Sequence, residues 1–186
     1  MNAYLWLVIG WVVYFSLHSV MAAPAIKSRF KARPYRVFYT IVASVGLLFM
    51  LFLNGTIKAE PFFLREGIVR YLSLTLTAFG VILIQLAFRQ YSLKGFLGLA
   101  EEKSNELRRE GILQSIRHPI YAGLILIVLG YFLFSPNLPT LVSCLCIYAY
   151  LPIGIYLEEK KLIAHHGDAY LKYKAEVPAL IPKIKF

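Results

Sequence analysis

The longest uncharged stretch of the chain runs from Pro119 to Leu157 and reads PIYAGLILIVLGYFLFSPNLPTLVSCLCIYAYLPIGIYL. These 39 residues contain no Asp, Glu, Lys or Arg. A helix needs only about 20 apolar residues to cross the hydrocarbon core of a bilayer, so the stretch is too long for one crossing. Its segment 135–139, SPNLP, holds two prolines, which end helices. The stretch therefore predicts two helices, 119–134 and 140–157, joined by a tight turn.

Three further uncharged stretches precede this pair, at 4–23, 37–57 and 71–88. The chain is 59% hydrophobic and only 16% charged, which lies well outside the composition of soluble domains. The first stretch lacks the positive residues that begin a signal peptide, so we expect a permanent helix there. The sequence predicts one all-α integral membrane domain over 1–186, a bundle of about five transmembrane helices with a connection at 89–118 and a helical tail at 158–186.

Lys and Arg are distributed unevenly over the segments that join these spans. The segments 24–36, 89–118 and 158–186 hold five, six and six of them, whereas 58–70 holds three and 135–139 none. An odd number of spans places the three rich segments on one side, and cytoplasmic segments carry the excess of positive charge. We therefore expect the N-terminus outside and the C-terminus in the cytoplasm, in a prokaryotic inner membrane.

The sequence argues against a nucleic-acid-binding protein, a disulfide between the two cysteines, and a metal site. The net charge of +10 would suit nucleic acid, but the Phe and Tyr residues lie in apolar runs rather than beside a solvated basic face, so we expect membrane lipids as partners and no nucleic acid. Cys144 and Cys146 would point about 200° apart on a helix and cannot bridge each other. We expect no metal site, since ligand spacings are absent, and we expect His165 and His166 to be solvated.

The segment RHPIYAG at 117–123 marks the start of the fourth predicted span. Pro119 suits the first position of a helix and keeps His118 out of the helical conformation. Arg117 and His118 then flank a helix N-terminus, where free N–H groups and the helix dipole favour a carboxylate or phosphate. The alternative is that Arg117 and Tyr121 serve only as interfacial anchors.

A second polar group, Glu158-Glu159-Lys160-Lys161, follows the fifth predicted span. Adjacent helical side chains point about 100° apart, so we expect one carboxylate to face the bundle and the other to face water. A carboxylate at the bundle edge needs a cation, and Arg117 or a positively charged ligand would supply one. The alternative is an exposed Glu158–Lys161 pair.

These pieces occur in an ordered set with further motifs. RHPIYAG at 117–123 is followed by LEE at 157–159, HGD at 166–168, YLKY at 170–173 and VPALIP at 177–182. The set resembles the C-terminal half of the isoprenylcysteine carboxyl methyltransferase superfamily of integral membrane enzymes. In the first half, LHSVMA at 17–22, Lys27 and YRVFY at 35–39 are similar to methanethiol S-methyltransferases and NnrU-like proteins of that superfamily.

The resemblance implies S-adenosyl-L-methionine as cofactor and a set of residues that bind it. Those positions are Asn105, Glu106, Leu107, Arg108, Arg117, His118, Pro119, Tyr121 and Glu158. The local chemistry agrees with it, because a helix N-terminus suits the carboxylate of this cofactor and Glu158 suits its ammonium and sulfonium groups. Residues 105–108 depart from the His-x-Leu-Val of many relatives, so the adenosine end is expected to be held differently.

The expected reaction is methyl transfer to a small or lipophilic acceptor. A thiol is favoured, because Gly154 and Glu176 stand where the prenylcysteine enzymes carry Arg. A thiol must lose a proton, which Glu158, His118 or His18 would take; the alternative for His18 is a packing residue. Isoprenylcysteine and phospholipid remain open as alternative acceptors. The alternatives outside the methyltransferases are a sterol-type reductase and a non-enzymatic membrane transporter or assembly partner. The oligomeric state is not fixed.

Overall fold

The structure is a computed structural model that describes residues 2–64, 66–90, 93–97, 99 and 106–182. Its helices are α1 (Ala3–Ala22), α2 (Pro24–Lys27), α3 (Ala32–Thr56), α4 (Ile68–Gln90), α5 (Leu93–Phe96), the 3₁₀ helix η1 (Gly111–Gln114), α6 (Pro119–Phe134), α7 (Leu138–His166) and α8 (Asp168–Glu176). The described residues form no strand, which confirms the predicted all-α class.

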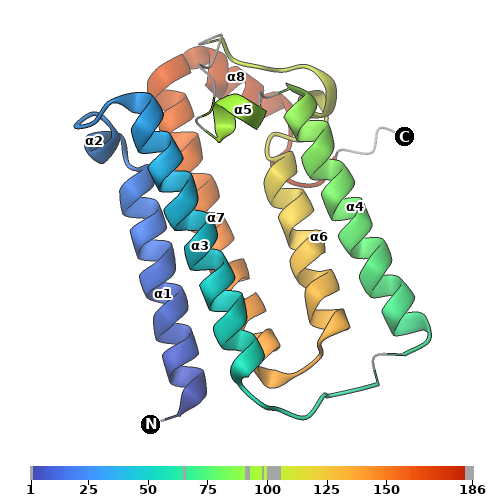
Figure 1. The fold of residues 1–186 in the computed structure, drawn as a ribbon. Helices are drawn as coiled ribbons and strands as arrows, with labels where there is room; N and C mark the ends of the chain where they lie inside the picture. The colour runs from blue at the N-terminus through green and yellow to red at the C-terminus, as the bar shows by residue number, and fades with distance from the viewer. Residues whose placement is uncertain (1, 65, 91–92, 98, 100–105, 183–186) are drawn as a thin grey trace.

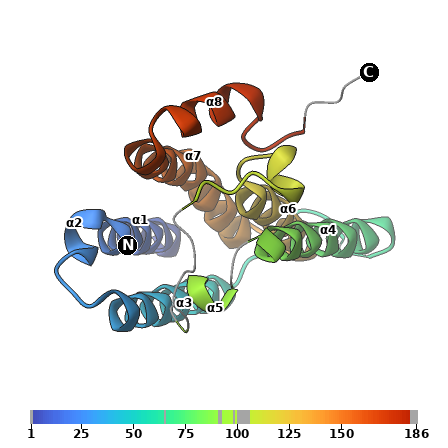
Figure 2. The same ribbon diagram turned by 90° about the horizontal axis from the view of Figure 1, so that it is seen from above.

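The long helices α1, α3, α4, α6 and α7 lie side by side in one bundle (Figures 1 and 2). Helices α1, α3, α4 and α7 are long and apolar enough to cross a membrane. Helix α6 is equally apolar but has 16 residues, which rise about 24 Å. It forms a hairpin with α7 through the turn at 135–137, as the prolines predicted. The chain is therefore an integral membrane protein.

Two helices extend well beyond the predicted spans. Helix α3 begins at Ala32 rather than at 37, and its first turns hold Arg33 and Arg36, whose guanidinium groups donate to backbone carbonyls of the segment that contains α5. Helix α7 continues to His166 rather than ending at 157, because the residues after Leu157 are good helix formers. It ends at Gly167, whose φ of 53° is open to glycine at little cost. The acidic pair therefore lies inside α7.

Small residues hold α4 against α6. A Cβ atom added to Gly80 would come within 2.5 Å of the Gly123 carbonyl oxygen, and one added to Gly123 would come equally close to that of Gly80. The Ser73 hydroxyl donates to the Gly130 carbonyl at 2.8 Å further along the same interface. Close backbone approach through small residues is how helices associate in membranes, where hydrophobic burial gives little drive.

A buried set of polar side chains, here called the central network, joins the other helices. The Trp11 indole N–H donates to Ser143 at 2.9 Å, and the Ser143 hydroxyl donates to Asn54 at 2.9 Å. The Asn54 amide donates to Tyr131 at 2.8 Å and to Thr140 at 3.3 Å. The network connects α1, α3, α6 and α7, and each polar side chain in it has a partner inside the bundle.

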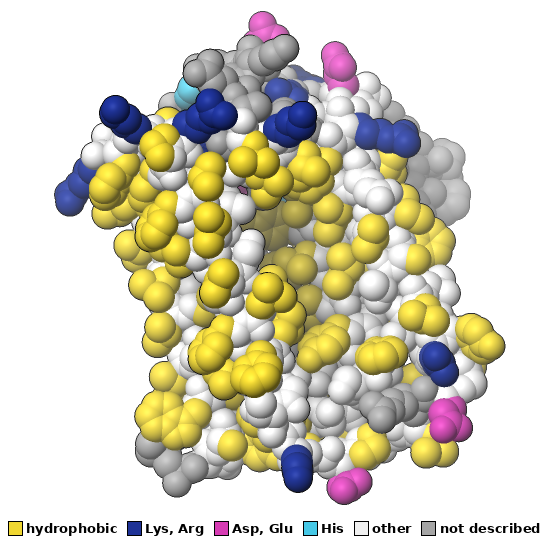
Figure 3. Space-filling view, viewed as in Figure 1, with side chains coloured by type: hydrophobic (Ala, Val, Ile, Leu, Met, Phe, Trp, Pro, Cys, Tyr) yellow, Lys and Arg dark blue, Asp and Glu magenta, His cyan; other side chains and the backbone are white. Residues whose placement is uncertain are grey.

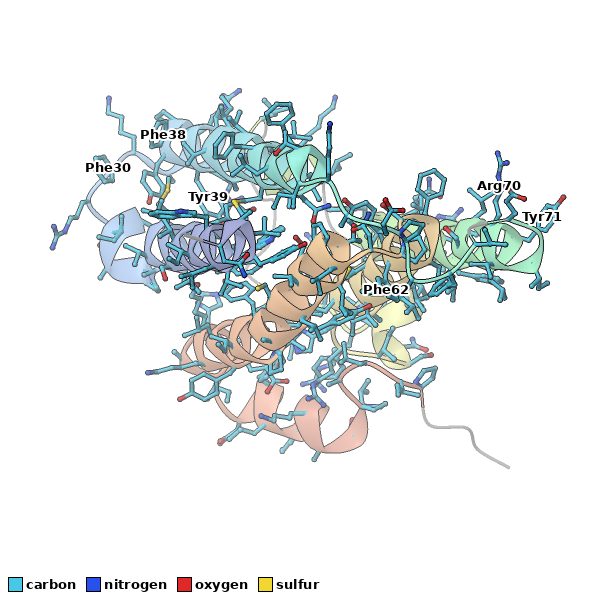
Figure 4. The ribbon with its side chains drawn as sticks, turned by 90° about the horizontal axis from the view of Figure 1, so that it is seen from below. Phe30, Phe38, Tyr39, Phe62, Arg70 and Tyr71 are labelled. Atoms are coloured by element: carbon cyan, nitrogen blue, oxygen red, sulfur yellow. The ribbon has the colours of Figure 1, made fainter. Side chains whose placement is uncertain are left out.

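At the end of the bundle where the N-terminus lies, the connection between α3 and α4 packs on the turn between α6 and α7. The Phe62 N–H donates to the Pro136 carbonyl at 2.7 Å, and the Phe62 ring packs near Phe132 (Figure 4). Arg70 and Tyr71, at the start of α4, point away from the bundle in the same view.

The opposite end, here called the basic end, gathers α2, α5 and α8 (Figures 1 and 2). Lys and Arg side chains line it, and below them hydrophobic side chains cover the visible face (Figure 3). Arg33 and Arg36 of α3 donate to the carbonyls of Leu99 and Gly95, which ties α5 to α3. Figure 3 also shows that this face is hollowed between α3 and the α4–α6 pair.

Candidate functional site

The start of α6 lies at the basic end, where the C-terminal segment crosses it. His118 is the N-cap residue, with φ −121° and ψ 63°, and Pro119 takes the first helical position, as the sequence predicted. The backbone N–H groups of Arg117 and His118 donate to the carbonyls of Pro178 and Ala179, each at 2.9 Å. The C-terminal segment therefore fixes the two residues that precede α6.

Beyond these two, the N-terminus of α6 has free donors. In the part of the chain that the structure describes, the backbone N–H groups of Ile120 and Tyr121 have no acceptor, and no side chain caps the helix. Free N–H groups and the helix dipole together make such an end attractive to an anion. The predicted anion-binding end of α6 is thus left open at these two residues.

The structure decides which carboxylate of the acidic pair is buried. Glu159 is 7% exposed. Its Oε1 accepts from Arg117 Nη2 at 2.7 Å and lies 3.1 Å from His118 Nε2, and its Oε2 accepts from Lys174 Nζ at 2.6 Å. Since Arg117 was one of the two expected cations, that expectation is confirmed, with Glu159 as its partner.

Arg117 is occupied by these contacts. Its Nε and Nη2 donate to Glu159, and its Nη1 donates to the carbonyls of Lys174 and Val177. The Arg117 side chain is only 8% exposed. The contacts of Arg117 are those of a residue that holds α7 and the C-terminal segment to the start of α6.

Glu158 lies on the other side of the His118 ring. Its side chain is 47% exposed, and its Oε2 lies 4.0 Å from His118 Nδ1. The Tyr121 hydroxyl lies beside its carboxylate, and the Tyr121 ring meets the His118 ring edge-on at 5.6 Å. We call this group, Glu158, His118 Nδ1, Tyr121 and the start of α6, the Glu158 face.

Gly154, one helical turn before Glu158, borders the same face. A Cβ atom at this position would lie 3.1 Å from the Tyr121 hydroxyl, so a larger side chain would crowd it. The glycine keeps the space beside Tyr121 free.

His18 lies in a second polar group, formed between α1, α3 and α7. The Tyr39 hydroxyl is 3.0 Å from His18 Nε2, and Figure 4 shows Tyr39 pointing from α3 toward α1. The hydroxyls of Ser19 and Tyr150 are 2.8 Å apart, and the Tyr150 ring stacks on Phe15 at 4.1 Å.

Three of the other predicted cofactor residues precede η1 in the chain. Glu106, Leu107 and Arg108 lie in an irregular segment before η1, and no ion pair or hydrogen bond among the described residues joins Glu106 or Leu107 to the Glu158 face. Asn105 lies outside the described residues. The structure thus brings together His118, Pro119, Tyr121 and Glu158, whereas His18 contacts Tyr39 in the second polar group.

Helix α8 covers this end from the outside. The Tyr173 hydroxyl donates to the Leu113 carbonyl of η1 at 2.6 Å, and Arg109 donates to the Ala169 carbonyl. Tyr170 is 1% exposed, and burial, together with the charge of Glu159, raises the pKa of its phenol. The Tyr170 hydroxyl therefore stays neutral beside the Arg117–Glu159 pair.

Sequence reasoning missed the role of Lys174 and the pairing of Ser19 with Tyr150. Lys174 is one of several Lys residues in the tail, and nothing in its neighbours marks it as the partner of Glu159, 15 positions away. The Ser19–Tyr150 contact joins residues 131 positions apart. Only the packing of α1 and α8 on α7 could have revealed these contacts.

The comparisons with known proteins agree with the resemblance. The chain is 28% identical over 192 residues to the methanethiol S-methyltransferase of Crocosphaera subtropica, which covers 95% of this chain and 74% of that protein. It is 27% identical over 183 residues to the methanethiol S-methyltransferase of Pseudomonas deceptionensis, which covers 90% of this chain and 68% of that protein. It is also 34% identical over 83 residues to the protein-S-isoprenylcysteine O-methyltransferase of Schizosaccharomyces pombe, covering 44% of this chain and 35% of that protein.

No solved structure matches the chain. The family model described as NnrU protein matches residues 6–181, nearly the whole sequence. The chain belongs to the NnrU protein family.

Proposed function

We propose that the protein is a membrane methyltransferase that moves a methyl group from S-adenosyl-L-methionine to a small or lipophilic acceptor, with a thiol favoured. The observation that carries this proposal is the Glu158 face, where a half-exposed carboxylate lies beside the uncapped start of α6. The names of the relatives support the same class of reaction.

The residues present fit the two charged ends of the cofactor's methionyl part. The free N–H groups of Ile120 and Tyr121 suit its carboxylate, and the Glu158 carboxylate suits its ammonium and sulfonium groups. When bound, the cofactor supplies a methyl group activated by a positively charged sulfur. Glu158, Tyr121 and the start of α6 would hold and orient it, while Gly154 leaves room beside the Tyr121 hydroxyl.

The acceptor would approach from the side of the bilayer. The hollow between α3 and the α4–α6 pair lies in an apolar face, so a lipophilic molecule could enter there without crossing water (Figure 3). A thiol acceptor must lose its proton, and Glu158, His118 or the His18 imidazole beside Tyr39 would take it. Much of the rate would come from alignment, which contributes about 7–11 kcal/mol in well-oriented reactions.

The proposed orientation follows from charge. The basic end would face the cytoplasm of a prokaryotic inner membrane, with the N-terminus outside, because cytoplasmic segments carry the excess of Lys and Arg. The cofactor is water-soluble and would enter from that side. The whole chain would act as one membrane domain.

Isoprenylcysteine is the second candidate acceptor. The match to the isoprenylcysteine enzyme of Schizosaccharomyces pombe favours it. That match has a higher identity than the two methanethiol S-methyltransferase matches reported above, but it covers less than half of this chain. A carboxylate acceptor would need a cation at the Glu158 face. Arg117 is taken by Glu159 and the C-terminal segment, so the described contacts favour a thiol.

The test is methyl transfer by the purified protein in detergent, with radiolabelled cofactor and either methanethiol or N-acetyl-farnesylcysteine as acceptor. We expect transfer to the thiol and loss of transfer in Glu158→Gln. Glu66→Gln, an exposed carboxylate at the far end of the bundle, is the matched control and should behave as the wild type. Absence of transfer to any acceptor by folded wild-type protein would contradict the proposal.

A further inference from the structure

The His118 imidazole is held between the two carboxylates of the acidic pair. Its Nε2 lies 3.1 Å from Glu159 Oε1, and its Nδ1 lies 4.0 Å from Glu158 Oε2. The ring is 2% exposed, and the Tyr121 ring lies edge-on against it. The ring therefore has little freedom to turn, and its two nitrogens face different carboxylates.

The two carboxylates differ in what surrounds them. Glu159 is buried with Arg117 and Lys174 against its oxygens, so it is ionised and fixed, and it can only accept hydrogen bonds. In the neutral imidazole one nitrogen is a donor and the other an acceptor. Placing the proton on Nε2 satisfies Glu159, whereas placing it on Nδ1 would turn a lone pair toward the Glu159 oxygen in a buried space.

We propose that Glu159 is a positioning residue that fixes the Nε2–H tautomer of His118. The Nδ1 lone pair is then presented on the same side as the Glu158 carboxylate, 4.0 Å away. Two acceptors that face one space favour a group with several N–H donors and a positive charge, because such a group satisfies both. The ammonium group of the cofactor's methionyl part has this chemistry, so the inference rests on the proposed function.

Lys174 offers a control for a purely structural role of Glu159. It pairs with Oε2, the oxygen that His118 does not contact. Lys174→Ala weakens the hold of α8 on α7 but leaves Oε1 available to His118. A tautomer effect should therefore appear in Glu159→Gln and be absent in Lys174→Ala. Lys172→Ala, on an exposed position of the same helix, controls for the loss of a surface charge.

The first measurement is the ¹⁵N nuclear magnetic resonance spectrum of the ligand-free protein, labelled at its histidines and held in detergent at a pH where imidazoles are neutral. The His118→Asn variant identifies the resonances of His118 by their loss. We expect a protonated Nε2 and a bare Nδ1 in the wild type and in Lys174→Ala. In Glu159→Gln we expect a mixture of tautomers. A protonated Nδ1 in the wild type, or an unchanged spectrum in Glu159→Gln, would overturn the proposal.

The second measurement is calorimetric binding of two ligands that share the adenosine and thioether but differ in the amino-acid part. S-adenosylhomocysteine carries the ammonium group and methylthioadenosine lacks it. We expect Glu159→Gln to weaken the first about 10-fold and to leave the second unchanged, by analogy with the lower end of the loss seen when the carboxylate that orients a metal-binding histidine is removed. If Glu159→Gln weakened both ligands equally, or weakened neither, the proposed role of the His118 tautomer in binding the ammonium group would be contradicted. Failure of wild-type protein to bind either ligand would instead count against the proposed function, while the ¹⁵N spectrum still decides the tautomer.

Discussion

The central network and the Glu158 face are both polar groups inside a membrane protein, but they differ in how completely their atoms are paired. In the central network Ser143 and Thr140 are 0% exposed, and Asn54 bridges them to Tyr131. In the Glu158 face one carboxylate is 47% exposed, and two N–H groups of α6 have no acceptor among the described residues. A paired polar group stabilises the fold, whereas an open one is available to a ligand. Mutations should therefore separate stability from activity.

The largest effect is expected from Arg117→Ala, which breaks the buried pair behind the Glu158 face. Removing Arg117 takes away one partner of the buried Glu159 carboxylate and leaves only Lys174 and His118 against it, a kind of loss that typically costs about 3–5 kcal/mol. The free energy of unfolding, measured by titration from mild detergent into sodium dodecyl sulfate, should fall by that amount. Lys172→Ala should leave it within about 0.5 kcal/mol of the wild type. An unchanged value for Arg117→Ala would mean that Glu159 gains nothing from this pair.

The next effect is expected from Glu158→Gln, the neighbouring carboxylate. Because this side chain is half exposed and forms no ion pair with a Lys or Arg among the described residues, its loss should leave the free energy of unfolding almost unchanged. Methyl transfer should fall about 100-fold, the lower end for losing a positioned charged or acid–base group. Steady-state kinetics and the same unfolding titration check both halves of this expectation. A variant that unfolds easily yet keeps full activity would reverse the assignment of the two carboxylates.

The packing of α4 on α6 gives a purely steric reference for these polar effects. Gly80→Leu should destabilise the protein by about 1–3 kcal/mol, because even its Cβ would lie 2.5 Å from the Gly123 carbonyl oxygen. Gly55 has no atom within 4 Å of an added Cβ, so Gly55→Leu is the matched control. Unfolding titrations should show a clear loss of unfolding free energy in Gly80→Leu, and a smaller loss or a gain in Gly55→Leu. Equal effects would show that α4 does not press on α6 as described.

The smallest effect is expected in the central network itself. Asn54→Ala removes a side chain that pairs with Tyr131, Thr140 and Ser143, and hydrogen bonds between membrane helices are worth about 0.6 kcal/mol on average and at most about 1.7. We expect a loss of about 1 kcal/mol in unfolding free energy and unchanged kcat. A selective loss of activity without loss of stability would place Asn54 with the functional residues instead.

Much of the fold could be predicted from the sequence, because lipid imposes simple requirements. Long uncharged stretches located the five apolar helices, and Pro119 marked the start of α6. The acidic pair was recognised as two carboxylates with different surroundings. Which of them is buried could not be predicted, since the answer depends on Arg117, 42 positions away, and on Lys174, which reaches Glu159 only because α8 folds back on α7.

The same limit explains the missed length of α7 and the missed tyrosine contacts. Charged residues end a membrane span in sequence, but they do not end a helix, so α7 runs on to Gly167. The hydroxyl pair of Ser19 and Tyr150 depends on how α1 lies against α7, which no local pattern records. Local chemistry was readable in the sequence, and contacts between distant helices were not.

The central claim is that the Glu158 face binds the cofactor. Isothermal titration calorimetry of the detergent-purified protein with S-adenosyl-L-methionine tests it most directly, with Glu158→Gln measured beside the wild type. We predict saturable one-site binding to the wild type and binding at least about 10-fold weaker in a variant of equal stability. Absence of binding by folded wild-type protein at millimolar cofactor, or equal affinity in Glu158→Gln, would contradict the claim.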